Sequence, residues 1–86
     1  MKIAEPKVEI SIPVYNEQGD LEERVLTLNS FLESSFPFDA TITIVDNAST
    51  DMTWPIAERL AETYPTISAI RLMQKGKGLA LLTART

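Results

Sequence analysis

The sequence lacks several residue types on which whole classes of proteins depend. Its 86 residues include no cysteine, which excludes disulfide bonds and thiolate metal sites. Histidine, the commonest general base and metal ligand, is also missing, so acid–base chemistry would fall to carboxylates, lysine or tyrosine. No apolar run approaches the roughly 20 residues that cross a bilayer. A chain of this length forms one small domain with a thin stability margin.

Positive charge is scarce as well. Eight Lys and Arg stand against twelve Asp and Glu, the formal net charge is −4, and the basic residues are scattered. Nucleic-acid-binding proteins usually carry a basic face, so we expect no nucleic-acid partner. Residues 1–7 form a short, charged tail interrupted by Pro6, which does not resemble a signal peptide. A cytoplasmic location is therefore the expectation.

Short stretches of the chain have the composition of β-strands. In the first, Val8, Ile10, Ile12 and Val14 alternate with other residues, the period of two that marks a strand with one buried face. Two later stretches are also rich in β-branched residues. We predict strands over the following ranges: 8–14, 40–45 and 67–72.

Helical patterns separate these strands. Asp20 has the position of an N-cap, with Glu23 in capping-box spacing. Apolar residues then recur along one helical face over residues 21–34: Leu21, Val25, Leu28 and Leu32.

A second helix is expected between Thr53, which can cap it, and Pro65, which stops it, with Trp54 packing at its start. A third helix is expected to begin over residues 79–85. The order β-α-β-α-β-α implies a parallel sheet with right-handed crossovers. We predict an α/β, three-layer Rossmann-like half-domain over residues 8–86, truncated in the third helix.

A polar loop follows each predicted strand, over residues 15–19, 46–51 and 73–78. Ligands of open parallel sheets bind at the carboxyl ends of the strands, so these loops are expected to meet at one edge. The residues placed there are Asn16, Glu17, Asp46, Asn47, Ser49, Asp51, Lys75 and Lys77.

The chemistry of this edge suits a nucleotide. The Asp46 carboxylate can accept hydrogen bonds from a nucleobase or a ribose, and Tyr15 offers an aromatic surface for a base. Gly76 and Gly78 permit close backbone approach at a helix start that favours phosphate. The better-known G-x-G-x-x-G and P-loop motifs are absent, so a dinucleotide fold and a P-loop fold are disfavoured.

Each of these residues also has a structural interpretation. Asp46 could cap the following turn through its side chain, and Asp51 could order the loop before the second helix. Glu17 and Lys77 could be solvated charges, and Tyr15 could pack over the end of the sheet.

Three segments of the chain resemble motifs of family 2 glycosyltransferases, which have the GT-A fold. Residues 12–17 (IPVYNE) resemble the I-P-x-Y-N-E opening of that family, and residues 44–51 (IVDNASTD) resemble its V-D-D-G-S-T-D segment. Residues 76–81 (GKGLAL) are similar to its G-K-G-x-A-L helix start. The nearest group is dolichyl-phosphate mannose synthase-like and polyprenyl-phosphate sugar transferase-like. The resemblance covers only the front part of the family's catalytic domain.

The resemblance implies a role for each matching position. Asp46 would contact the base or ribose of a sugar nucleotide, while Asp51 would hold the loop or lie near the nucleotide. Asn47 replaces a common aspartate and Ala48 replaces a common glycine, so donor preference and loop shape are expected to differ. The remaining predicted binding residues are Pro13, Tyr15 and Glu17 around the base, and Lys77 near the base or phosphates.

The resemblance also implies an activity: hexosyl transfer from a UDP- or GDP-sugar to a hydroxyl or a polyprenyl phosphate. The family's Mg²⁺- or Mn²⁺-binding acidic pair and its catalytic base lie further along the domain, so no catalytic or metal-binding residue is predicted here. We therefore expect the chain alone to lack activity. The alternatives are a non-catalytic nucleotide-binding or interaction module and a truncated, non-functional relative.

The family's sheet carries a further implication. Its first strand is interior, with a fourth strand beside it, and full-length relatives often work at the cytoplasmic face of a membrane. Because that fourth strand is missing, residues 8–14 are expected to form an open apolar edge through which the chain self-associates.

Overall fold

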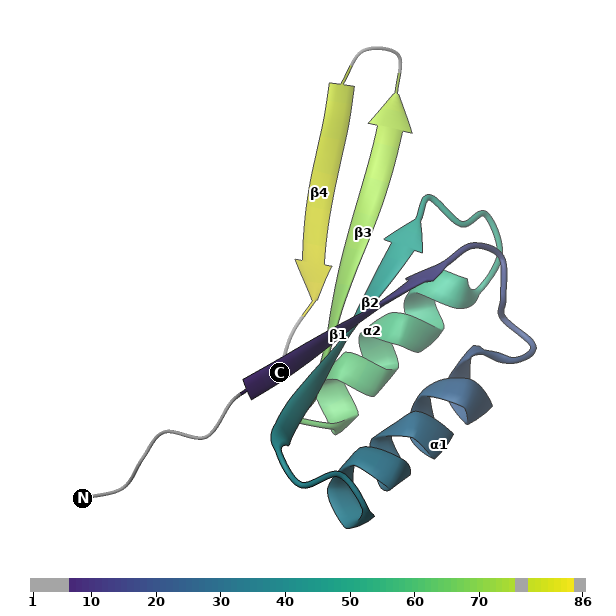
Figure 1. Cartoon of the computed structure of the whole chain (residues 1–86). Coiled ribbons are helices and arrows are strands. Elements are labelled where there is room, and N and C mark those ends of the chain that lie inside the picture. The colour runs from purple at the N-terminus through teal and green to yellow at the C-terminus, as the bar shows by residue number, and fades with distance from the viewer. Residues whose placement is uncertain (1–6, 76–77, 85–86) are drawn as a thin grey trace.

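The computed structural model describes residues 7–75 and 78–84. The elements in chain order are β1 (Lys7–Val14), α1 (Leu21–Ser34), β2 (Asp39–Asn47), α2 (Thr53–Thr63), β3 (Ile67–Lys75) and β4 (Gly78–Ala84). They form one four-stranded sheet in the order β1-β2-β3-β4 (Figure 1). Because β1, β2 and β3 run parallel, the predicted α/β half-domain is confirmed.

Both helices cover the same face of the sheet. Two successive right-handed crossovers in the same direction place α1 and α2 on that face, as Figure 1 shows. The residues pointing toward them are the most deeply buried, and Ile42, Ile44, Ile67 and Ala69 have no exposed surface. On the opposite face Thr41 is exposed. The described residues therefore form two layers rather than the three expected.

Helix α1 has the predicted bounds but a slightly different buried face. Leu21, Val25 and Leu32 are buried as expected, whereas Leu28 is only half buried and Asn29 takes a place in the core. The hydroxyl of Thr66 donates to Asn29 Oδ1 at 2.9 Å, which satisfies the buried amide oxygen and joins α1 to the segment after α2.

The predicted capping groups at the helix starts differ from the observed ones. Asp20 is the N-cap residue of α1, but its side chain makes no capping hydrogen bond. Thr53 is the first residue of α2 rather than its cap, and its backbone N–H donates to Asp51 Oδ1 at 2.8 Å. Trp54 is buried at the start of α2, as expected of a packing residue.

The third helix is the main error in the predicted fold. Residues 78–84 form β4, which pairs antiparallel with β3. A short apolar run cannot be assigned to helix or strand from its periodicity alone. Pairing with β4 satisfies backbone groups along the edge of β3, which a helix would have left open.

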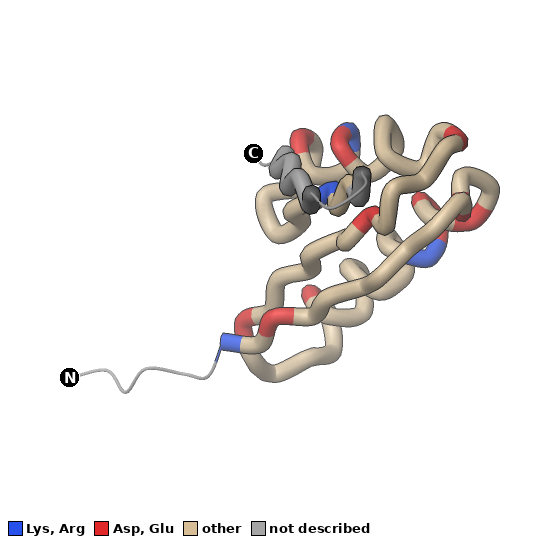
Figure 2. The backbone as a smooth tube through the Cα atoms, turned by 90° about the horizontal axis from the view of Figure 1, so that it is seen from above, with Lys and Arg blue, Asp and Glu red and all other residues tan. Residues whose placement is uncertain are grey.

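Charges of both signs are spread over the described chain (Figure 2). Each described arginine has a carboxylate partner: Arg24 with Glu17, Arg59 with Glu22, and Arg71 with Asp46. In the described residues, neither α1 nor α2 is long and apolar enough to cross a membrane.

Candidate functional site

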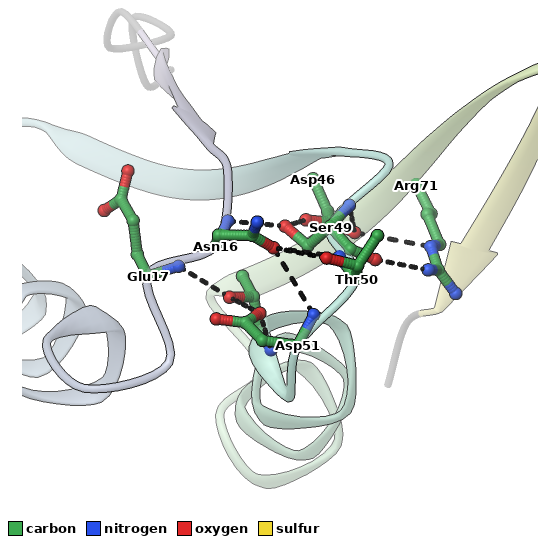
Figure 3. Close-up of polar contacts among 8 residues, drawn as sticks. Asn16, Glu17, Asp46, Ser49, Thr50, Asp51 and Arg71 are labelled. Atoms are coloured by element: carbon green, nitrogen blue, oxygen red, sulfur yellow. Dashed lines mark hydrogen bonds and ion pairs between the residues drawn. The ribbon is translucent and has the colours of Figure 1, made fainter.

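The loops after β1 and β2 are held together by the side chain of Asn16 (Figure 3). Asn16 Oδ1 accepts hydrogen bonds from the backbone N–H groups of Thr50 at 2.8 Å and Asp51 at 3.3 Å. The backbone N–H of Asn16 donates to Ser49 Oγ at 2.8 Å. These bonds span both loops at the carboxyl ends of adjacent parallel strands, which is where open α/β sheets bind ligands.

A second set of bonds ties the same loops to the start of α2. The backbone N–H of Glu17 donates to Thr53 Oγ1 at 2.7 Å, and that of Gln18 donates to Asp51 Oδ2 at 3.3 Å. In return, the backbone N–H of Met52 donates to Gln18 Oε1 at 2.9 Å. The two loops are therefore one braced unit, which we call the rim (residues 15–19 and 46–53).

Asp51 is held in its ionised form by this arrangement. Desolvation raises the pKa of its carboxyl, but hydrogen bonds from Thr53 and Gln18 outweigh that effect and leave the pKa below its ordinary value. The interpretation of Asp51 as a residue that orders the loop is the one that its contacts support.

Asp46 lies beneath the rim with no exposed surface. Its Oδ2 accepts a hydrogen bond from the Ser49 backbone N–H at 3.4 Å, and its Oδ1 accepts one from the Ser49 hydroxyl. This is the structural, turn-capping arrangement that the sequence left open as an alternative. Contact between Asp46 and a nucleoside stays a prediction.

Arg71 neutralises Asp46 from the neighbouring strand. The two residues are register partners on β2 and β3, and Arg71 Nε lies 3.3 Å from Asp46 Oδ2. Arg71 Nη2 donates to the Ser49 carbonyl at 2.8 Å, and the guanidinium lies 5.8 Å from the centre of the Trp54 ring. Arg71 thus links β3, the rim and the start of α2.

The rim contains two non-glycine residues with positive φ, Asn16 at 48° and Ala48 at 57°. Asparagine tolerates the left-handed region, whereas alanine pays a steric cost there. Ala48 stands where the family motif has glycine, and it nevertheless adopts a glycine-like conformation. Fixing this strained turn requires surrounding contacts, which the hydrogen bonds of Ser49 and Asn16 supply.

The other predicted site residues differ in exposure and in their position relative to the rim. Tyr15 is 55% exposed and Asn47 is exposed, so both are accessible at the rim. Pro13 is exposed on the sheet face away from the helices. Glu17 is partly buried and pairs with Arg24. Lys77 lies outside the described residues.

The third predicted loop does not join the rim in the expected way. Asn47, the last residue of β2, pairs with Leu72, but β3 continues through Lys75 before β4 begins at Gly78. Three more residues of strand carry the chain roughly 10 Å past the end of β2. The prediction of a loop that begins at residue 73 is therefore wrong over residues 73–75, which belong to β3.

Two residues that brace the rim carry no motif signal of that role in the sequence. The sequence predicts Asn16 at the edge without a specific role, and it predicts Arg71 only as part of a strand. Arg71 shares the alternation of Ile67 and Ala69, which places its side chain on the buried face. A charge at such a position needs a partner, so this alternation was the signal available.

Residues 9–85 match the family model described as glycosyl transferase family 2. The chain belongs to this family. The match includes both loops of the rim, so the braced segment around Asn16 and Asp46 corresponds to the front of a family 2 domain.

One curated relative is a dolichol-phosphate mannosyltransferase from Pyrococcus furiosus, to which the chain is 34% identical over 76 residues. The aligned region covers 88% of this chain and 21% of the relative. The chain thus spans about a fifth of the length of this curated relative.

Proposed function

We propose that this chain forms the donor-nucleotide-binding portion of a glycosyltransferase that uses a UDP- or GDP-sugar. The observation that carries the proposal is the rim itself: in a family 2 chain, Asn16 fastens two loops together at the carboxyl ends of parallel strands. A site assembled before the ligand arrives loses less entropy on binding.

The exposed rim residues have the chemistry that a nucleoside requires. The Tyr15 ring can stack on a base, and the Asn47 amide can both donate and accept hydrogen bonds. Asp46 can reach a nucleoside only after Ser49 and Arg71 release its oxygens, so in the observed arrangement it supports the rim from beneath. Glu17 and Asp51 hold the loops on either side of Asn16.

We propose that the complete reaction transfers a hexosyl group to a hydroxyl or to a polyprenyl phosphate, in keeping with the printed name of the Pyrococcus relative. An acceptor oxygen would form a bond to the anomeric carbon while the bond to the nucleoside diphosphate breaks. Among the described residues no three acidic side chains gather as metal ligands, and we assign no metal-dependent step to them. The chain alone is expected to yield no product.

Calorimetric titration of the 86-residue chain with UDP and with GDP tests this proposal. We expect at least one of them to bind, and Tyr15→Ala to weaken binding about fivefold or more, since stacking on an aromatic residue contributes roughly 1–3 kcal/mol per base. Phe31→Ala is the matched control, because Phe31 is equally exposed at 53% but lies on α1 outside the rim. Absence of binding by the folded chain, or equal loss in both variants, would refute the proposal.

A further inference from the structure

A cavity of about 260 Å³ lies at the end of the sheet opposite the rim. Its lining residues all lie between positions 29 and 66, in the last turns of α1, the start of β2 and the segment after α2. Figure 1 shows these three parts of the chain at the same end of the molecule. Because β2 carries the chain roughly 25 Å from Asp39 at the cavity to Asn47 at the rim, the two places are separate.

Asn29 presents a hydrogen-bond donor without a protein partner to this cavity. Its side chain is only 6% exposed and lies between the buried residues Val25 and Leu32 of α1. The Thr66 hydroxyl satisfies Asn29 Oδ1, but Asn29 Nδ2 has no hydrogen-bond partner within residues 7–75 and 78–84. Leucine would pack at such a position without burying a donor, which indicates a use for the amide beyond packing.

The pair formed by Asn29 and Thr66 suits a ligand hydroxyl. The oxygen of such a group can accept a hydrogen bond from Asn29 Nδ2. Its proton can be donated to Thr66 Oγ1, whose own proton is already used on Asn29 Oδ1. A hydroxyl therefore completes the hydrogen bonding of both side chains.

The mouth of the cavity is acidic. Glu33 follows Asn29 by one turn on the same face of α1, and Asp39 is the first residue of β2. Neither carboxylate belongs to an ion pair within the described residues, and no described lysine or arginine lines the cavity. Lys7 is the register partner of Asp39, yet the two form no ion pair. The mouth therefore favours a positively charged group and disfavours a phosphate.

Two aromatic rings form the apolar part of the lining. Phe36 and Phe38 lie edge to face, with ring centres 5.6 Å apart, and Phe38 remains 41% exposed. Aromatic rings pack against hydrocarbon and attract organic cations. The volume is slightly below the range of about 300–1,000 Å³ that is usual for ligand pockets, so the cavity fits a molecule smaller than a nucleotide.

We propose that this cavity binds a small organic amino alcohol. The ammonium group of the ligand lies at Glu33 and Asp39, and its hydroxyl lies further in, at Asn29. Its hydrocarbon part packs against Phe36 and Phe38. A bare metal ion is a poorer occupant, because no three acidic side chains gather as metal ligands within the described residues.

Titration of the 86-residue chain with aminocyclohexanol, followed by two-dimensional ¹H–¹⁵N NMR, tests the proposal. This probe carries its amine and its hydroxyl on adjacent carbons of an apolar ring. We expect saturable shifts of the Phe36, Phe38 and Thr66 amides in the millimolar range. Cyclohexanediol, the neutral analogue of the same shape, should bind about fivefold more weakly or less, because it lacks the charge. Equal affinity for the two probes, no binding, or shifts centred on the rim would overturn the proposal.

The carboxylate arm is tested by Glu33→Gln. This substitution should weaken binding of aminocyclohexanol about threefold or more and leave binding of cyclohexanediol unchanged. Glu23→Gln is the matched control, because Glu23 is also exposed on α1 but lies ten residues, or roughly 15 Å, before Glu33. Equal effects of the two substitutions on the amine would contradict a role for Glu33.

The hydroxyl arm is tested by Asn29→Leu, which keeps a buried side chain of similar length on α1. It should lower the affinity for aminocyclohexanol about threefold or more but leave the affinity for cyclohexylamine, which has no hydroxyl, nearly unchanged. The comparison of two ligands on one variant separates a lost contact from a general change in the cavity. Equal losses for both ligands would remove Asn29 from the site.

Discussion

Asp46 and Arg71 face each other across β2 and β3, with Arg71 Nε 3.3 Å from Asp46 Oδ2. The carboxylate has no exposed surface, while the arginine side chain retains 25% exposure. A buried carboxylate is costly unless it is paired and hydrogen-bonded, and Arg71 and Ser49 meet both requirements. The pair therefore neutralises the charge that is buried beneath the rim.

Replacing Arg71 is expected to be strongly destabilising. Arg71→Met leaves the Asp46 charge buried without its partner, and we expect the free energy of unfolding to fall by about 2–4 kcal/mol. Urea denaturation measures the change. Arg59→Met is the control, because Arg59 and Glu22 form an exposed pair that is worth about 1 kcal/mol or less.

A double-mutant cycle separates the pair from general packing. Asp46→Asn removes the buried charge. The free energy of unfolding of the double variant Asp46→Asn/Arg71→Met should therefore fall by much less than the sum of the losses of the two single variants. Additive effects would mean that Arg71 stabilises the chain chiefly through Trp54 and the Ser49 carbonyl.

Asn16 should be the residue that fastens the rim. Asn16→Ala removes the acceptor for the Thr50 and Asp51 amides, and we expect a loss of about 1–3 kcal/mol with faster exchange of those amide protons. Asn16→Asp keeps an acceptor oxygen and should retain most of the protection. Asn47→Ala, at an exposed neighbouring position, should leave exchange at Thr50 unchanged. Equal exchange in the two alanine variants would remove Asn16 from this role.

The parts of the fold that could be predicted were those with a repeating pattern. Alternation over residues 8–14 and the apolar period over residues 21–34 gave β1 and α1 nearly residue by residue. Residues 78–84 gave no such signal, because a short apolar run fits a strand or a helix equally well. Their structure depends on the open edge of β3, a tertiary feature that periodicity does not contain.

The position of the site could be predicted from the sequence, but not which of its residues are exposed and which are buried. The order of strands placed Asn16, Asp46 and Asp51 at one edge, and the rim gathers them there. Which of them points outward depends on the register between β2 and β3 and on Arg71, which lies four residues after the start of β3. Burial of Asp46 therefore emerges only from the assembled sheet.

Ala48 offers a way to stabilise the rim. Its φ of 57° is costly for alanine but not for glycine. Allowing for the greater freedom of glycine in the unfolded chain, Ala48→Gly should raise the free energy of unfolding by roughly 0.5–1 kcal/mol. Ala57→Gly, within α2, should lower it by about 1 kcal/mol or more. Chemical denaturation of both variants checks the sign, and a destabilised Ala48→Gly would mean that the turn is not strained.

Asp51 gives the rim a dependence on pH. Its pKa is lower in the folded chain than its ordinary value of 3.8, so the ionised form stabilises the fold. This contribution is complete above that ordinary value and is lost as the pH falls through the lower folded pKa. Unfolding measured from pH 7 to pH 2.5 should show wild type losing its advantage over Asp51→Asn at the acid end. A difference that stays constant with pH would rule out the assigned role.

Nucleotide binding at the rim is tested most directly by two-dimensional ¹H–¹⁵N NMR of the chain titrated with UDP and GDP. The account predicts saturable shifts that centre on the amides of Tyr15, Asn16, Asn47 and Thr50. Shifts confined to the opposite end of the sheet around Phe36 and Phe38, or none at millimolar nucleotide, would contradict it.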